Sequence, residues 1–248
     1  MTKPRPRVLR AATALALGLA GCVPALDHFR AYDVKPVPVS FKVQLSDQLD
    51  PAPKDAQLDA LVLFANPSRK LHGANHAGIK DGDRHFTWYA VKQAQPEPRR
   101  TVRFRNQFGQ HSVDIRDPRF LLVPAQKTSD PGSEFPKTLD HYKCYEIVTV
   151  NTAPALPVVT LGDQFDTASV QVGAPKLFCT PVKKVRESEP PVGIQNAKDH
   201  LAIYDLPPKP VARDIKALDQ FGDHELVVTR SVLLVVPTEK QVVVAHPN

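Results

Sequence analysis

Apolar and polar residues alternate with a period of two in short stretches that recur along most of the chain. Such a stretch precedes each of four turn-like Asp/Asn-Gln tripeptides: 43–45, 102–104, 159–161 and, more weakly, 215–217. Comparable stretches follow three of the tripeptides, at 113–115, 170–172 and 226–228. Period-two alternation in β-branched and aromatic residues predicts strands with one buried face. After residue 22 no segment has a convincing amphipathic-helix pattern.

Three sequence landmarks recur in a fixed order. The first is a histidine followed four residues later by tyrosine: His28 and Tyr32, His85 and Tyr89, His141 and Tyr145, His200 and Tyr204. The second is the tripeptide, which carries Gln48, Gln107, Gln164 and Gln220. The third is a proline that follows apolar residues, with a lysine three residues later: Pro67 and Lys70, Pro124 and Lys127, Pro181 and Lys184, Pro237 and Lys240.

The landmark histidines are 57, 56 and 59 residues apart. We therefore predict an all-β fold made of four tandem antiparallel repeats of about 57 residues, copies one to four, which span 28–70, 85–127, 141–184 and 200–240. A unit of this size is near the limit of independent stability, so we expect neighbouring copies to share a core. Sandwich-like or barrel-like units are the expected packing, and a four-bladed propeller is the alternative. Both an open array and a closed ring are compatible with the sequence.

The first 21 residues predict an export signal. Residues 1–10 contain four basic and no acidic side chains, and residues 11–20 form an apolar run too short to span a membrane. The following Leu19-Ala20-Gly21-Cys22 resembles a bacterial lipobox, which implies that Cys22 becomes the lipidated first residue of the mature protein. Residues 22–27 would then link the lipid to the first copy. The alternative is ordinary cleavage after Ala25, which would discard Cys22.

The two remaining cysteines lie in copy three, one residue before the landmark tyrosine and two before the landmark proline. The same two positions change together in the other copies: Ala31 with Ala65, Trp88 with Leu122, Cys144 with Cys179, and Ile203 with Val235. Joint variation indicates that the positions touch in each copy. In an oxidising compartment the Cys144–Cys179 pair would form a disulfide, and the alternative is two buried thiols. Closing a loop of about 35 residues would stabilise the fold by about 3.5–4 kcal/mol.

The segments around His141-Tyr-Lys-Cys-Tyr145, Asp163-Gln164-Phe165 and Leu177-Phe-Cys-Thr-Pro181 resemble a repeat of secreted bacterial proteins of unknown function. In that family a Lys-Cys-Tyr segment and a Leu-Cys-x-Pro segment flank an Asp-Gln-Phe segment. The resemblance extends through 28–240, although copies one, two and four lack both cysteines. It implies no activity and no ligand.

Charge does not favour nucleic acid as a partner. The chain has 32 basic and 26 acidic residues, and removal of the four basic residues of the signal leaves 28 against 26. The remaining basic residues are scattered, whereas nucleic-acid binding needs a clustered basic face. We therefore expect contact with a membrane only through the N-terminal lipid.

Polar residues in the repeats give several candidate sites, each with a structural alternative. His28, His85, His141 and His200 would converge on a metal if the copies formed a ring, or bond backbone groups at strand starts. The four tripeptide glutamines would bind a polar ligand, or bond backbone groups at the turns. A further set, in the loop 71–84, comprises His72, His76, Asp81 and Asp83. This set suits a metal-dependent hydrolase or a solvated loop.

No nucleophile, phosphate-loop or dinucleotide motif occurs, and we expect no cofactor and no metal. The sequence therefore favours a non-enzymatic binding or structural module, lipid-anchored at the bacterial cell envelope, whose partner is an envelope protein or a glycan. The alternative is an envelope hydrolase with its site in the loop 71–84.

Overall fold

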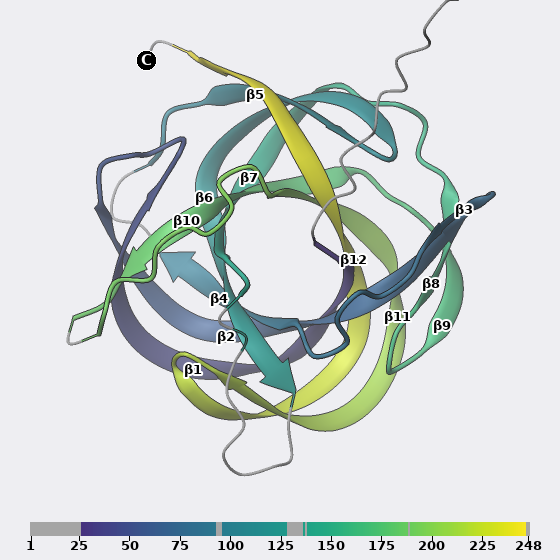
Figure 1. Ribbon diagram of the computed structural model, residues 1–248, viewed down its shortest axis with the longest axis horizontal. Coiled ribbons are helices and arrows are strands. Elements are labelled where there is room, and N and C mark those ends of the chain that lie inside the picture. Colours follow the sequence, from purple (N-terminus) through teal and green to yellow (C-terminus); the bar gives the residue numbers. More distant parts are fainter. Residues whose placement is uncertain (1–25, 93–95, 128–135, 137, 188, 247–248) are drawn as a thin grey trace, which may run out of the picture.

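The computed structural model describes residues 26–92, 96–127, 136, 138–187 and 189–246, and the described part is all-β (Figure 1). The predicted signal, Cys22 and the start of its linker lie outside this part. Every pairing between strands is antiparallel. The strands are β1 (His28–Asp47), β2 (Lys54–His72), β3 (Asn75–Ala77), β4 (His85–Lys92), β5 (Arg100–Asn106), β6 (Gly109–Lys127), β7 (His141–Thr152), β8 (Val158–Gly162), β9 (Thr167–Gln171), β10 (Pro175–Val185), β11 (His200–Asp219) and β12 (Gly222–Ala245).

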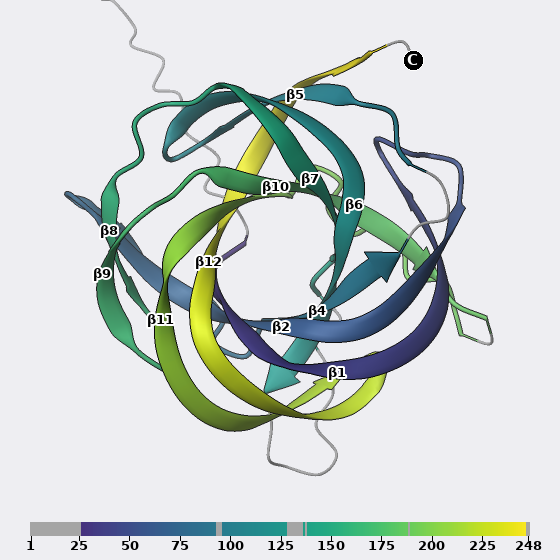
Figure 2. The same ribbon diagram turned by 180° about the vertical axis from the view of Figure 1, so that it is seen from behind.

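The strands form a ring-like sheet, which is visible from both sides in Figures 1 and 2. Hydrogen-bonded neighbours follow one another in the order β1, β2, β4, β6, β7, β10, β11, β12 and back to β1. Strands of different copies therefore pair directly, so the copies form one antiparallel ring-like sheet, as the all-β prediction allows, and are not packed as sandwich-like units. The ring excludes the open array, because Phe29 of β1 lies opposite Val235 of β12.

The register gives the ring two distinct ends. At one end the landmark histidines lie beside the residues that follow the landmark prolines, as His28 lies opposite Ser68 and His200 opposite Thr238. We call this the histidine end. Five residues further along, about 17 Å at the usual rise, Asp33 lies opposite Leu63. We call this opposite end the mouth.

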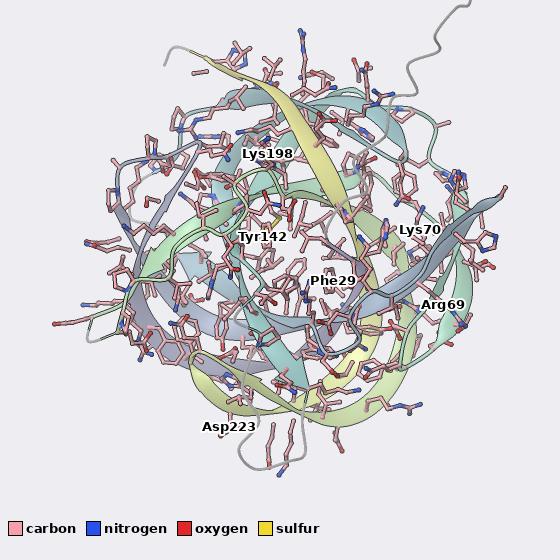
Figure 3. The ribbon with its side chains drawn as sticks, viewed as in Figure 1. Phe29, Arg69, Lys70, Tyr142, Lys198 and Asp223 are labelled. Carbon is pink, nitrogen blue, oxygen red and sulfur yellow. A yellow bond between two sulfur atoms is a disulfide. The ribbon has the colours of Figure 1, made fainter. Side chains whose placement is uncertain are left out.

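Inward-facing residues fill the ring with one hydrophobic cluster drawn from all four copies. It includes Phe29, Phe86, Tyr142 and Leu201 near the histidine end, all fully buried. Figure 3 shows Phe29 and Tyr142 inside the ring. The expectation that neighbouring copies share a core is therefore confirmed, because no copy encloses a core of its own.

Outside the ring the hairpins continue as arms, and each arm pairs with a strand end of the copy two positions away. Prolines at the bends, such as Pro36 and Pro207, lack the N–H that a ladder requires, and the register shifts there. The four arm contacts join 44–47 to 182–185, 100–105 to 239–245, 160–162 to 69–71, and 217–219 to 125–127. We call the contacts between copies one and three, and between copies two and four, the odd and even diagonals.

Residues 211–220 are strand and turn, as their position in the repeat predicts. The segment 71–84, expected to be an unstructured loop, contains the short strand β3, which folds back on the end of β2. Gly73 makes this turn with a φ of 57°, a conformation that glycine adopts without steric cost. Within the described residues no helix is long and apolar enough to cross a membrane.

Candidate functional site

The positions that vary together face one another across adjacent strands inside the ring. Each predicted pair is a direct cross-strand pair, and all eight side chains are fully buried: Ala31 with Ala65, Trp88 with Leu122, Cys144 with Cys179, and Ile203 with Val235. The cysteines form a disulfide. Their Cα atoms are 4.0 Å apart, which is closer than the separation of about 5.5–6 Å that is most common in disulfides. Directly opposed strand residues hold the two Cα atoms closer together.

The landmark histidines begin four different strands of the ring, β1, β4, β7 and β11, and do not converge on one point. The Nδ1 atoms of His85 and His200 lie 3.0 and 2.8 Å from the backbone oxygens of Asp83 and Lys198. Burial, together with a nearby landmark lysine, lowers the pKa of all four rings from 6.5: to about 3 for His28 and His141, and to about 4 for His85 and His200. The rings are therefore neutral at pH 7. In His85 and His200 the backbone contact is the structural alternative to a metal ligand.

Landmark lysines join each copy to the next one. Their ammonium groups lie over the phenylalanine of the following copy's tripeptide: Lys70 over Phe108 at 4.9 Å, Lys127 over Phe165 at 5.2 Å, and Lys184 over Phe221 at 4.4 Å. Burial lowers the pKa of Lys70 and Lys184 to about 8. An aromatic face partly compensates an ammonium that has lost water. Sequence reasoning identified these lysines but gave them no role.

The tripeptide glutamines also serve contacts between copies. Lys127 donates to Gln164, Lys240 donates to Gln48, and Gln107 bonds the ring of His28. The Nε2 of Gln164 donates to the backbone oxygen of Gly82, 3.3 Å away. The backbone oxygens that Gln48 and Gln164 reach, those of Ala197 and Gly82, lie in distant loops and not at the turns where backbone bonding was expected.

Each tripeptide turn is held by a tyrosine from the diagonal copy. The first residue of the turn accepts the backbone N–H two residues later, an Asx turn, in all four copies. Its other side-chain atom bonds a landmark tyrosine: Tyr145 to Asp47 at 2.7 Å, Tyr32 to Asp163 at 2.5 Å, Tyr89 to Asp219 at 2.7 Å, and Asn106 to Tyr204 at 2.8 Å. The repeated polar residues therefore hold the ring and its arms together.

The candidate residues of the loop 71–84 do not form a joint site. His72 and Asn75 are opposed across the β2–β3 turn, and His76 is exposed. Asp81 pairs with Arg84 at 2.9 Å and accepts the N–H of Asp83. Throughout the described part of the chain, no three His, Cys, Asp or Glu side chains are grouped so that they could hold a metal ion.

The mouth of the ring carries a hollow of about 620 Å³. Its apolar floor includes Leu63, Phe120 and Leu233, which pack on the cluster inside the ring. Pro207 and Pro208 line one wall. The mouth, which combines a hollow with an apolar floor, is therefore a candidate binding site.

Ion pairs surround the mouth. The residue after the landmark tyrosine is acidic in three copies, and each carboxylate pairs with a basic side chain of a neighbouring strand: Asp33 with Arg230 at 2.6 Å, Glu146 with Arg119 at 2.5 Å, and Asp205 with Lys176 at 3.0 Å. Sequence analysis missed this rim, although the recurring acid after tyrosine was a usable signal.

Comparison with protein families gives a match over much of the chain. Residues 85–237 match the family described as a repeat of unknown function (DUF7450). The chain belongs to this family. The match begins at a landmark histidine and ends at a landmark proline, so the DUF7450 repeat spans copies two to four and more than half of the chain. No curated protein and no solved structure matches the chain.

Proposed function

We propose that the protein is an exported, lipid-anchored module of the bacterial cell envelope that binds an envelope protein or a glycan at the mouth and catalyses no reaction. The observation that carries the binding role is the hollow at the mouth, with its apolar floor and charged rim. Exposed ion pairs of this kind contribute little to stability. They are therefore free to exchange partners with a ligand at small cost.

Export is supported by the disulfide and by the N-terminal pattern. A disulfide persists in an oxidising compartment and is rare in the bacterial cytosol. The apolar run at 11–20 and the lipobox-like Leu19–Cys22 supply the route and the anchor. Two or more acyl chains on Cys22 would hold the protein at the membrane far better than one.

Mass spectrometry of protein from native membranes tests the anchor. We expect an N-terminus at Cys22 that carries acyl mass. An unmodified N-terminus at Leu26 would contradict lipidation and would support ordinary cleavage.

Photo-crosslinking in cells tests the binding surface. A photoreactive phenylalanine analogue at Val232, which lines the mouth, should give a discrete adduct with an envelope component. The matched control is the same residue at Val242, which is 43% exposed and does not line the mouth. Adducts of equal yield at both positions, or none at Val232, would contradict the mouth as the binding site.

The hydrolase alternative stays a prediction, and the grouping of the loop residues gives it no support. Metal analysis of the purified protein tests it. Stoichiometric metal that is lost in His72→Ala/His76→Ala would replace the proposal with that alternative.

A further inference from the structure

The first described residues of the chain are fixed firmly to the histidine end. Leu26 is 7% exposed and packs in the cluster inside the ring with Phe29. The carboxylate of Asp27 accepts the backbone N–H groups of Lys80 and Asp81, at 2.8 and 3.1 Å. The point where the chain enters the ring is therefore bonded to the loop between copies one and two.

The loop between copies three and four is held at the same end by the equivalent aspartate. Asp140 accepts the backbone N–H groups of Gln195 and Asn196, at 2.6 and 2.8 Å. Two loops, 71–84 and 185–199, thus form a fixed face around the histidine end, and Ile79 is one of its exposed apolar side chains.

The distance from Cys22 to this face is limited by the chain itself. Four residues extend at most about 13–14 Å. The ring wall between the histidine end and the mouth is about 17 Å long along its strands, and strand tilt makes its height somewhat smaller. Only a tether fully extended along the wall would therefore bring Cys22 level with the mouth.

From these distances we infer that the face formed by the loops 71–84 and 185–199 lies against the lipid surface, and that the mouth points away from it. This inference rests on the proposed lipidation of Cys22. Within 71–84, two basic residues balance two acidic ones, and 185–199 has two basic and three acidic residues. The face is therefore not drawn to anionic lipid by charge, and the short tether alone sets the orientation.

The test uses the mature chain from Cys22 onward, coupled through that thiol to a maleimide lipid in phosphatidylcholine vesicles. Cys144 and Cys179 are bonded to each other, so Cys22 is the reactive thiol. Two variants report position: Ile79→Trp on the loop face, and the matched control Val148→Trp. Both residues are exposed, at 38% and 43%, and Val148 lies beyond the mouth along β7.

A quencher carried on the lipid headgroups should remove most of the added emission of Ile79→Trp and leave that of Val148→Trp unchanged. Equal quenching of the two variants, stronger quenching at Val148, or no quenching of vesicle-bound protein would overturn the inference. A long Gly-Ser insertion between Cys22 and Leu26 should abolish the difference. If the difference persists, the tether does not set the orientation.

Failure of this inference is distinct from failure of the proposed function. The lipid in the vesicle test is attached chemically, so its result does not depend on what the cell adds to Cys22. A native N-terminus without acyl mass would remove the anchor in the cell, and the vesicle result would then describe the tethered protein alone.

Discussion

The odd and even diagonals solve the same contact with different chemistry. On the odd diagonal the turn carries a second aspartate, and each pairs with a fully buried cation of the opposite copy: Asp50 with Lys143 at 3.2 Å, and Asp166 with Arg30 at 3.5 Å. On the even diagonal the equivalent turn positions are Gly109 and Gly222, with φ of 115° and 127°. There His111 and His224 lie 3.1 and 3.0 Å from the hydroxyls of Tyr204 and Tyr89.

The difference shows that copy one is complementary to copy three, and copy two to copy four. Arg30 and Lys143 need an acid two copies away, because an unpaired buried charge is costly. Thr87 and Ala202 occupy the equivalent positions on the even diagonal and need none. An exchange of copies one and two would therefore leave buried cations opposite glycine turns.

The largest expected effect comes from breaking the buried pair. Lys143→Ala should lower the free energy of unfolding by about 3–5 kcal/mol, because it removes a fully buried side chain with its ion pair and opens a gap. Asp50 then keeps its other ion pair, with the partly exposed Lys54 at 2.8 Å. The matched change on the even diagonal, Thr87→Ala, removes a hydrogen bond to the carboxylate of Asp219 and should cost about 1.5–3 kcal/mol. Urea denaturation measures both. Equal losses would show that the charge pair does not distinguish the diagonals.

Both diagonals enclose the same central cluster, so a change there serves as a reference. Ile203→Ala should cost about 2–4 kcal/mol through lost apolar transfer and the cavity left opposite Val235. Thermal or urea unfolding measures the loss. The opposed pair Ala31–Ala65 has little side chain to lose, so we expect copy one to be the softest part of the cluster. Faster amide exchange in copy four than in copy one would contradict this.

A smaller difference should separate the tyrosines. Tyr145→Phe removes a donor to the carboxylate of Asp47 and should cost about 1.5–3 kcal/mol, whereas Tyr204→Phe, beside the uncharged Asn106, should cost about 0.5–1.5 kcal/mol. Denaturant midpoints at pH 7 measure both losses. A greater loss for Tyr204→Phe would show that the charge of the first turn residue does not set the strength of the bond to the tyrosine.

The smallest expected effect is on pH dependence. Burial lowers the pKa of His111. Below about pH 6.5 the unfolded chain therefore binds a proton at this ring that the native protein does not bind, and the free energy of unfolding decreases. This histidine's contribution is complete above pH 6.5 and is lost as the pH falls. The hydrogen bond from Lys209 of copy four lowers the pKa of Asp166, so the turn of copy three loses that contribution as the pH falls below about 3.8.

His111→Gln should therefore flatten the stability profile between pH 6.5 and 5. Stability measured across this range tests the change, with the exposed loop variant His76→Gln as the control. An equal flattening in both variants would mean that His111 contributes no more to the pH dependence of stability than an exposed histidine does.

Local contacts could be predicted from the sequence, and distant ones could not. Residues 31 and 65, or 203 and 235, vary together because they touch across one hairpin, and period-two alternation located the strands around them. The bonds from Tyr32 to Asp163 and from Lys143 to Asp50 join copies that are two repeats apart. Ring closure creates them, and no spacing within one copy signals it. The alternation of Asp50 and Asp166 with Gly109 and Gly222 was visible in the sequence, but its meaning depended on knowing the diagonals.

The pairing of β1 with β12 has a consequence for how the protein folds as it is synthesised. Phe29 of β1 pairs with Val235 of β12, which lies more than 200 residues later in the chain. Until β12 has been made, β1 has a neighbouring strand on one side only at this point. During synthesis the amino end emerges first, so the first hairpin stays an open edge until the last one has been made. Contacts between residues so distant in sequence form slowly, and until they form the unpaired strand edges are prone to aggregation. Loss of the final hairpin would thus leave the edge of β1 unpaired. A newly made chain would need a chaperone to cover this edge until β12 pairs with β1.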